Sequence, residues 1–363
     1  MRESSIVVRP QPMGSATYTA SSRLQAAGLS TAIALFEQAA RAVPLPRAPQ
    51  PIAIADYGAA AGYNSLLPIG AAIGALRART RPDHAILVAH TDLPGNDFTA
   101  LFTTITEDPD SYLAKDPATF ASAVGRSFYQ QILPSDSIAL GWSSWATHWL
   151  RRVPAPIADH IHIAHSADEA AHRAYWRQAA DDWHDFLAYR GREIAPGGRL
   201  VILTLGLDSA DKAGFGGVMD ALLESLQQLT TERIIGEPEL ARMAIPTVGR
   251  TEKELLAPFS PSGRFEGLSV EHLDLFDAED RFWSRYQLDG DAGALGARWA
   301  GFARAAVFPT LMTALDSGPA DPRTADVIAR LESDVAARIA ARPQPMTIPL
   351  AALVAVKGRR LSG

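Results

Sequence analysis

The stretch Ile52-Ala53-Ile54-Ala55-Asp56-Tyr57-Gly58-Ala59-Ala60-Ala61-Gly62 decides the expected fold. Its apolar start predicts a buried strand, and the glycine-containing segment after Asp56 predicts a turn whose backbone can approach a ligand closely. A helix after this turn would direct its N-terminal amides at that ligand. A turn with a purely structural purpose is the alternative, because glycine turns after strands are common.

The order of residues around this turn bears on the kind of ligand. Dinucleotide-binding folds carry G-x-G-x-x-G at this place and an acidic residue about 20 residues later. Here Asp56 precedes the turn, and the second glycine of that pattern is missing. A nicotinamide dehydrogenase is therefore disfavoured. An acidic side chain that closes the first strand suits a ligand with an amino group, which points to S-adenosylmethionine (SAM).

Expected strands and helices alternate through much of the chain. Strands are expected at 52–57, 84–90, 137–142, 199–205, 270–277 and 347–356, and helices at 21–41, 64–79, 96–106 and 167–194. This alternation predicts an α/β fold with a largely parallel sheet that binds ligands at the carboxyl ends of its strands.

Two segments, 213–265 and 288–318, break the alternation and are expected to form a mostly helical cap that helps to bind the substrate. Residues 1–212 and 266–363 would then form the SAM-binding domain around the sheet, with residues 1–41 closing the site.

Composition restricts the class of protein. The chain has 363 residues, of which 47% are hydrophobic, so it can bury a full core. A net charge of -6 disfavours nucleic acid or an anionic membrane as the main partner. The absence of cysteine excludes disulfides, thiolate nucleophiles and zinc-thiolate sites. Because neither a secretory signal nor a long apolar stretch is visible, we expect a soluble, cytoplasmic protein without a membrane span.

Several separated segments carry a second and more specific signal. They are Thr17-Tyr18-Thr19-Ala20-Ser21-Ser22-Arg23-Leu24-Gln25, Asp56-Tyr57-Gly58 with Asn64, Asp92-Leu93-Pro94-Gly95-Asn96-Asp97-Phe98, Gly125-Arg126-Ser127-Phe128-Tyr129, and Trp142-Ser143-Ser144-Trp145-Ala146-Thr147-His148-Trp149. Taken in order, they resemble the SABATH family of SAM-dependent carboxyl methyltransferases, which methylate salicylate, benzoate and related compounds. The resemblance implies a Rossmann-like class I methyltransferase sheet with SAM as the methyl donor and S-adenosylhomocysteine as the product.

The resemblance also implies the residues that bind SAM. They are Tyr18, Ser22, Asp56, Gly58, Asn64, Asp92, Leu93, Ser127 and Phe128. In this interpretation Asp56 pairs with the ammonium group and Asp92 accepts the ribose hydroxyls. Ser127 would hydrogen-bond the adenine edge, while Leu93 and Phe128 would cover its two faces.

The family match further implies a clamp for the substrate carboxylate, made by Gln25, His148 and Trp149. Amide and indole N–H groups are hydrogen-bond donors that suit this task. No general base is expected, because a carboxylic acid is already ionised near pH 7. The implied substrate pocket comprises Trp145, Val218, Met219, Phe302 and Ala303.

The pocket residues bear on the substrate. Met219 and Ala303 stand where members that act on aromatic acids have bulkier side chains, so a longer, adaptable apolar slot is expected. Residues 22–30, 141–146 and 299–306 also resemble the mycobacterial fatty acid O-methyltransferases, a bacterial branch of the family. A medium-chain fatty acid is therefore the expected substrate. The alternatives are an aromatic or indolic acid, or a non-catalytic SAM- or lipid-binding protein. Members are often homodimers, so a homodimer is a further expectation.

The residues disfavour two other classes of enzyme. A serine hydrolase needs G-x-S-x-G, and Gly141-Trp142-Ser143-Ser144-Trp145 lacks the last glycine. His160, His162 and His165 could suggest a metal site, since alternation would place the first two on one face of a strand. We expect them instead to be solvated side chains on a partly exposed edge, and we expect no metal.

Overall fold

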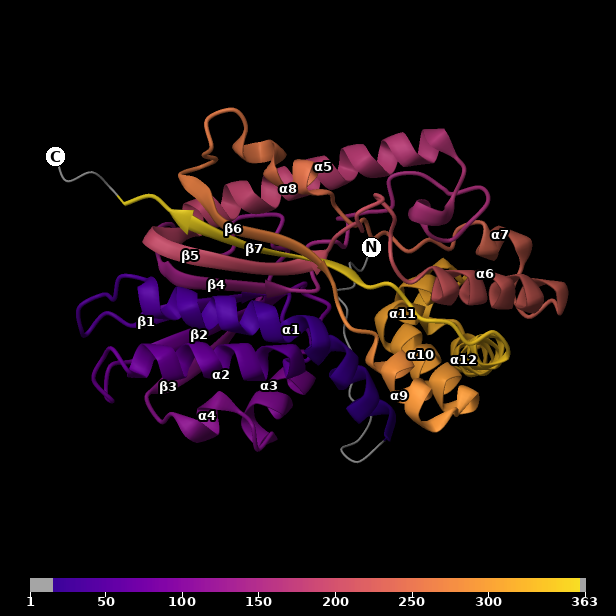
Figure 1. Ribbon diagram of the computed structural model, residues 1–363, viewed down its shortest axis with the longest axis horizontal. Coiled ribbons are helices and arrows are strands. Elements are labelled where there is room, and N and C mark those ends of the chain that lie inside the picture. The colour runs from indigo at the N-terminus through magenta and orange to yellow at the C-terminus, as the bar shows by residue number, and fades with distance from the viewer. Residues whose placement is uncertain (1–15, 360–363) are drawn as a thin grey trace.

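The computed structural model describes the backbone of residues 16–359 and the side chains of residues 29–359. Within this part a 7-stranded sheet has the order β3-β2-β1-β4-β5-β7-β6 (Figure 1). Its strands are β1 (Ile52–Tyr57), β2 (Ile86–Asp92), β3 (Thr119–Gly125), β4 (Ile138–Ser144), β5 (Ile194–Leu205), β6 (Leu268–Asp277) and β7 (Pro349–Lys357). Neighbours among β1 to β5 pair in parallel, and β7 pairs antiparallel with both β5 and β6. The predicted α/β class is confirmed.

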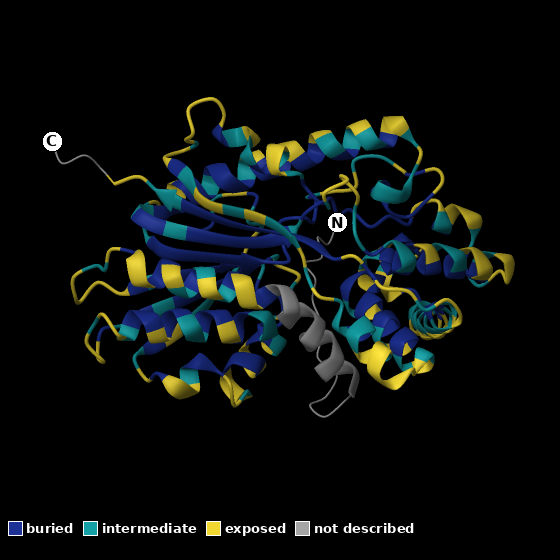
Figure 2. Cartoon of the chain, viewed as in Figure 1, coloured by how far each residue is buried: buried dark blue, intermediate teal, exposed yellow. Residues whose placement is uncertain are grey.

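Helices cover both faces of the sheet. α1 (Ala16–Ala42) and α2 (Tyr63–Arg77) pack on one face, with α3 (Phe98–Glu107) and α4 (Tyr112–Lys115) beside them. α5 (Glu169–Glu193) and the short α8 (Glu252–Leu256) cover the other face. In β5, Val201 and Leu203 face the core of α1 and α2, whereas Leu200 and Ile202 face that of α5. Residues 200–203 of this strand are a continuous apolar run because both faces of the strand are buried there (Figure 2).

The remaining helices gather beyond the carboxyl ends of the parallel strands (Figure 1). They are α6 (Gly216–Thr231), α7 (Glu237–Leu240), α9 (Arg281–Asp289), α10 (Ala292–Ala306), α11 (Phe308–Leu311) and α12 (Thr324–Ala341). α12 packs against α10 and α6. None of the helices in residues 16–359 is both long and apolar enough to cross a membrane.

The expected strands and helices are present within a few residues of their predicted bounds, but β3 and α12 were not predicted. β3 is an edge strand whose side chains are mostly half-buried, so its sequence lacks a strong apolar run. Residues 251–265 also differ from the expectation of a cap, because Leu255 and Phe259 pack with Trp183 of α5. The division into a SAM-binding domain and a cap stays a prediction.

A buried ion pair fixes the loop that follows β3. Arg190 Nε and Nη2 donate to the carboxylate of Glu193 at 2.9 Å, and neither side chain is exposed. Arg190 also donates to the carbonyls of Phe128 and Gln130, and Glu193 accepts the backbone N–H of Ile132. The loop after β3 is therefore held against the C-terminal end of α5, and this contact places Phe128.

Replacing Arg190 with methionine should destabilise the fold strongly. Glu193 would remain buried without its cation, a change that costs about 3–5 kcal/mol. Arg192→Met is the matched control because Arg192 is exposed, and its effect should stay within about 0.5 kcal/mol. Urea denaturation measures both free energies of unfolding. Equally small losses in the two variants would show that the buried pair does not hold the loop.

Candidate active site

The turn after β1 packs closely against the ends of β2 and β4. Ala60 N donates to Asp92 Oδ2 at 2.8 Å, and Asn96 Nδ2 donates to Ala60 O at 2.8 Å. Gly58 has a φ of +90°, and a Cβ added there would lie 2.5 Å from Ala146 Cβ. Only glycine fits this position, for both reasons. The turn and the Asp92–Asn96 segment thus form one rigid unit at the carboxyl edge of the sheet.

Asp56 lies buried at the end of β1 in a fixed orientation. Its Oδ2 accepts hydrogen bonds from Ser65 Oγ at 2.5 Å and from His90 Nδ1 at 2.7 Å. His90 Nε2 lies 2.7 Å from the Tyr112 hydroxyl. Burial, together with the charge of Asp56, raises the pKa of Tyr112, so its hydroxyl keeps its proton and can donate to His90. Within residues 29–359, Asp56 Oδ1 has no such partner and could accept a ligand's ammonium group.

The other predicted SAM-binding residues fall at the same edge where they can be placed. Asn64 is half-buried at the second position of α2, and Leu93 is half-buried directly after β2. Ser127 and Phe128 lie half-buried in the loop after β3, and a Cβ at Gly58 would lie 3.6 Å from the Phe128 ring. Tyr18, Ser22 and Gln25 belong to α1, but their side chains lie outside the described residues. The role of each residue toward SAM stays a prediction.

The segment after β4 concentrates buried polar atoms that have no hydrogen-bond partner within the described part of the chain. They are Ser144 Oγ, Trp145 Nε1, Thr147 Oγ1, His148 Nε2 and Trp149 Nε1. An unpaired buried polar group costs about 1–3 kcal/mol, so folded proteins contain few of them. Their accumulation within six consecutive residues therefore indicates a ligand site, and it includes the predicted clamp residues His148 and Trp149.

His148 is fully buried and electrically neutral. Burial, assisted by the charges of Arg250 and His162, lowers its pKa to about 3. The Thr204 hydroxyl lies 3.5 Å from His148 Nδ1, which is the outer limit of a hydrogen bond. By donating to Nδ1, this hydroxyl can favour the histidine tautomer that carries the proton on Nε2. His148 can therefore donate a hydrogen bond from Nε2, but it cannot serve as a base near pH 7.

Sequence reasoning assigned no role to Arg250 and Tyr129, whose side chains hydrogen-bond the backbone of the clamp segment. Arg250 is fully buried, and its Nη1 and Nη2 donate to the carbonyls of Thr147 and Ala179 at 2.9 and 3.1 Å. The Tyr129 hydroxyl donates to the carbonyl of Trp149 at 2.6 Å. These bonds hold the backbone on both sides of His148. No periodic pattern marks Arg250, so the sequence carried no signal for it, whereas Tyr129 closes the Gly125–Tyr129 motif segment but was given no role there.

The predicted pocket residues share one hydrophobic cluster with the clamp. Val218 and Met219 lie on α6, Phe302 and Ala303 lie on α10, and all are buried in the cluster that contains Trp145 and Trp149. Phe302 stacks on Phe215 with ring centroids 5.7 Å apart. Residues of α6 and α10 therefore belong to the same hydrophobic core as Trp145 and Trp149, and their assignment to a substrate pocket stays a prediction.

The histidine cluster is buried, which corrects the expectation of solvated side chains. His160 and His162 are only 8% and 7% exposed, and burial lowers the pKa of both. His162 Nδ1 accepts from Ala164 N and its Nε2 lies 2.9 Å from Thr247 Oγ1, so both ring nitrogens are engaged. Residues 29–359 contain no group of three or more histidine, cysteine, aspartate or glutamate side chains that could hold a metal ion. This cluster packs the loop before α5 onto residues 245–248.

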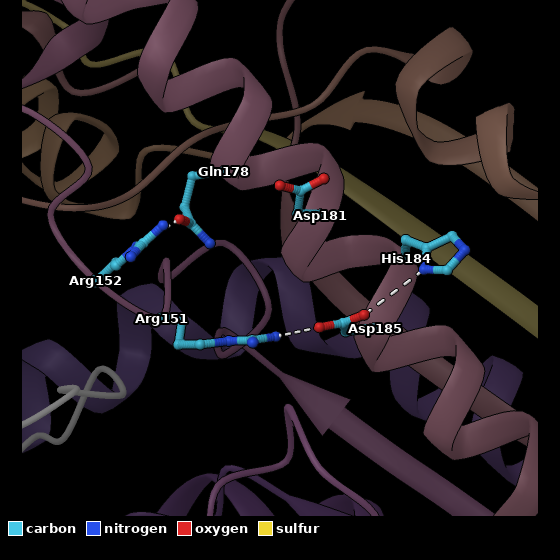
Figure 3. A pocket seen from close by; sticks show the side chains of 6 residues that line it. All are labelled: Arg151, Arg152, Gln178, Asp181, His184 and Asp185. Carbon is cyan, nitrogen blue, oxygen red and sulfur yellow. Dashed lines mark hydrogen bonds and ion pairs between the residues drawn. The ribbon is translucent and has the colours of Figure 1, made fainter.

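A polar cleft of about 400 Å³ lies beside α5, and its lining differs from that of the clamp region. Its residues are Arg151, Arg152, Gln178, Asp181, His184 and Asp185 (Figure 3). Arg151 Nη2 donates to Asp185 at 2.6 Å, and Arg152 Nε donates to Gln178 at 2.8 Å. The charged side chains largely pair with one another, so this cleft does not suit an apolar substrate.

Comparison with known proteins decides the family. Residues 7–348 match the sequence model of the family described as SAM dependent carboxyl methyltransferase. The chain belongs to this family. Its resemblance to the SABATH enzymes is thereby confirmed, and so is SAM as the cofactor of a methyltransferase.

Individual relatives agree with this assignment. The chain is 30% identical to a salicylate carboxymethyltransferase of Clarkia breweri, over 67% of this chain and 67% of that protein. It is 33% identical to the methyltransferase FUS9 of Gibberella moniliformis, over 69% and 67% of the two chains. A jasmonate O-methyltransferase of Arabidopsis thaliana is 29% identical over 62% and 64%.

A solved structure extends the similarity to the whole fold. The structure of a loganic acid methyltransferase with S-adenosylhomocysteine covers 97% of this chain and 99% of its own, with a TM-score of 0.75 and 21% identity. The Rossmann-like class I methyltransferase fold that the sequence predicted is confirmed by this match.

The buried histidines should make the fold sensitive to mild acid. The pKa of His148 and of His162 is about 3 in the folded protein, whereas an unfolded histidine titrates near about 6.5. Between these values the unfolded chain binds more protons, so the free energy of unfolding falls as the pH falls. Urea denaturation at about pH 7.5 and about pH 5.5 measures this loss.

His162→Gln should reduce this acid-induced loss of unfolding free energy by up to about 1.4 kcal/mol per pH unit, because the substitution removes one of the two buried histidines that titrate. His184→Gln, at an exposed position of α5, is the control and should leave the loss unchanged. The same loss in His162→Gln as in the wild type would contradict the explanation.

Proposed function

We propose that this carboxyl methyltransferase converts a medium-chain fatty acid to its methyl ester. The observation that carries the proposal is the pair of buried nitrogens His148 Nε2 and Trp149 Nε1, which have no hydrogen-bond partner among the described residues, with Trp149 in the same hydrophobic core as α6 and α10. Two N–H donors of this kind suit the carboxylate of an otherwise apolar molecule, because the anion supplies acceptors for both.

The apolar side of the site supports an aliphatic chain. Met219 contributes a flexible thioether that adapts to an alkyl chain, and Ala303 leaves more room than a larger side chain would. Residues 22–30, 141–146 and 299–306 resemble bacterial fatty acid methyltransferases, which favours the same choice. An aromatic acid is the second candidate, since one relative is named for salicylate and others for benzoic acid and salicylic acid.

The residues that would hold SAM surround the ends of β1, β2 and β3. Asp56, Asp92 and Phe128 lie there, and Gly58 permits a close approach of the backbone. SAM, when bound, supplies an electrophilic methyl group. Asn64, Leu93 and Ser127, three further predicted contacts, lie half-buried near these strand ends. Tyr18 and Ser22 are proposed as contacts from the family resemblance alone.

The chain's own part in the reaction is orientation. A fatty acid is ionised near pH 7, so no residue has to remove a proton, in agreement with the lowered pKa of His148, which makes this histidine a poor base. Gln25, His148 and Trp149 would hold one carboxylate oxygen and direct the other. Alignment of this kind can supply about 7–11 kcal/mol in favourable cases. Neutral donors suit the task, because a charged donor would bind the anion more tightly and weaken it as a nucleophile.

A panel of acids tests the substrate. Octanoate and decanoate should be methylated with kcat/KM values at least about tenfold above those of benzoate, salicylate and indole-3-acetate, because a poor fit of a few methylenes costs about 1–3 kcal/mol. Transfer of label from SAM to the ester measures each rate. The reverse order would favour the aromatic alternative. Bound SAM without an ester from any acid would favour a non-catalytic binding protein.

Trp149→Phe tests the clamp. The variant keeps an aromatic ring but loses the indole N–H, so kcat/KM for decanoate should fall about tenfold to a hundredfold while the Kd for SAM stays within about twofold. Trp183→Phe is the control, since its Nε1 donates to Leu255 O at 3.0 Å on the other face of the sheet. Parallel losses of SAM binding and turnover in Trp149→Phe would show that Trp149 is structural.

A homodimer and a cytoplasmic location stay predictions of the family resemblance and the composition. Light scattering and cell fractionation test them separately from the substrate.

A further inference from the structure

Trp145 adopts a backbone conformation that aromatic residues seldom have. Its φ is +56°, in the left-handed region, directly after β4. This conformation costs about 1–3 kcal/mol and persists only where the surrounding structure enforces it, often at ligand sites. Here the backbone N of Trp145 donates to Leu203 O at 2.8 Å, which anchors the turn to β5. The strained backbone fixes the direction of the indole.

The indole N–H of Trp145 lacks an acceptor. The side chain is 2% exposed, and its Nε1 has no hydrogen-bond partner within the residues that the structure describes. An indole nitrogen can only donate, so a neighbouring donor cannot compensate for the free-energy cost of leaving the N–H unpaired. The ring meets the His148 ring edge to face, with centroids 6.1 Å apart and planes at 90°. A third unpaired N–H therefore accompanies those of His148 and Trp149.

Hydroxyl groups lie on both sides of Trp145 in the sequence. Ser144 Oγ and Thr147 Oγ1 are buried and have no hydrogen-bond partner in the described part of the chain. Each hydroxyl can accept as well as donate. The segment therefore offers one N–H donor and two potential acceptors in addition to the clamp. A hydroxyl group on a ligand is the function that can accept from an indole N–H and also donate to a serine or threonine oxygen.

We propose that the substrate carries a hydroxyl group close to its carboxyl group, and that Trp145 recognises this hydroxyl. The inference rests on the proposed carboxyl methylation and narrows its substrate to hydroxylated medium-chain acids. A plain alkanoate occupies the clamp but leaves the Trp145 N–H unpaired. The hydroxyl is a recognition group only and is unchanged in the reaction. Since the Trp145 and His148 rings are in contact, the hydroxyl belongs on the second or third carbon.

The test compares decanoate with 2-hydroxydecanoate and 3-hydroxydecanoate, each hydroxy acid as separate enantiomers. For the wild type, kcat/KM should be about tenfold higher for at least one hydroxy acid than for decanoate, the value of one hydrogen bond of about 1.4 kcal/mol. Trp145→Phe keeps a ring and removes the N–H. It should abolish this preference, so that the ratio of kcat/KM for the preferred hydroxy acid to kcat/KM for decanoate falls to about one. Trp149→Phe is the matched control and should lower kcat/KM for all the acids alike.

The outcomes separate the two proposals. Methylation of decanoate with no preference for any hydroxy acid overturns the role of Trp145 but leaves the proposed function intact. No ester from any aliphatic acid overturns the proposed function itself. A preference that survives in Trp145→Phe, or a weaker Kd for SAM in that variant, also rejects the inference, because the N–H would then serve another group. The wild-type comparison decides the question even if Trp145→Phe does not fold.

Discussion

The close packing of the turn after β1 on its two neighbouring strands is the constraint on which the site depends. Gly58 leaves room for Ala146, which follows β4, and the backbone of Ala60 is fixed by the carboxylate of Asp92 at the end of β2. Parallel strands present their carboxyl ends at one edge of the sheet, and these two contacts fix the position of the turn at that edge. The predicted cofactor residues and the clamp are brought together because the turn cannot move away from either strand.

The clamp combines strong burial with weak charge. His148 is neutral because it is dehydrated and lies near Arg250, while Arg250 and Tyr129 hold the backbone around it through carbonyl groups. The segment thus presents N–H groups in fixed positions without a full positive charge directed at the ligand. An anion can be oriented there and still remain reactive, which is the requirement of a transfer that needs no base.

The sequence predicted the sheet, and it predicts a site at the carboxyl ends of the strands, because the relevant signals are local. The apolar run before Asp56 and the Asp92–Phe98 segment each combine a strand end with a turn. Other features depend on contacts between distant residues. Arg250 reaches Thr147 and Ala179 across the fold, and no spacing rule marks such a residue. β3 lacks an apolar pattern. The buried face of α12 consists of Val327, Leu331, Val335 and Ile339, which are four residues apart.

The placement of β7 between β5 and β6 determines how the cap helices are attached. After β5 the chain runs through α6 and α7 and returns to the sheet as β6, and after β6 it runs through α9 to α12 and returns as β7. These three strands are adjacent in the sheet (Figure 1). Separately from these connections, α1 packs against α9 and α10. The edge of the sheet formed by β5, β7 and β6 therefore carries the chain into and out of these helices, and α1 adds a non-covalent contact with them.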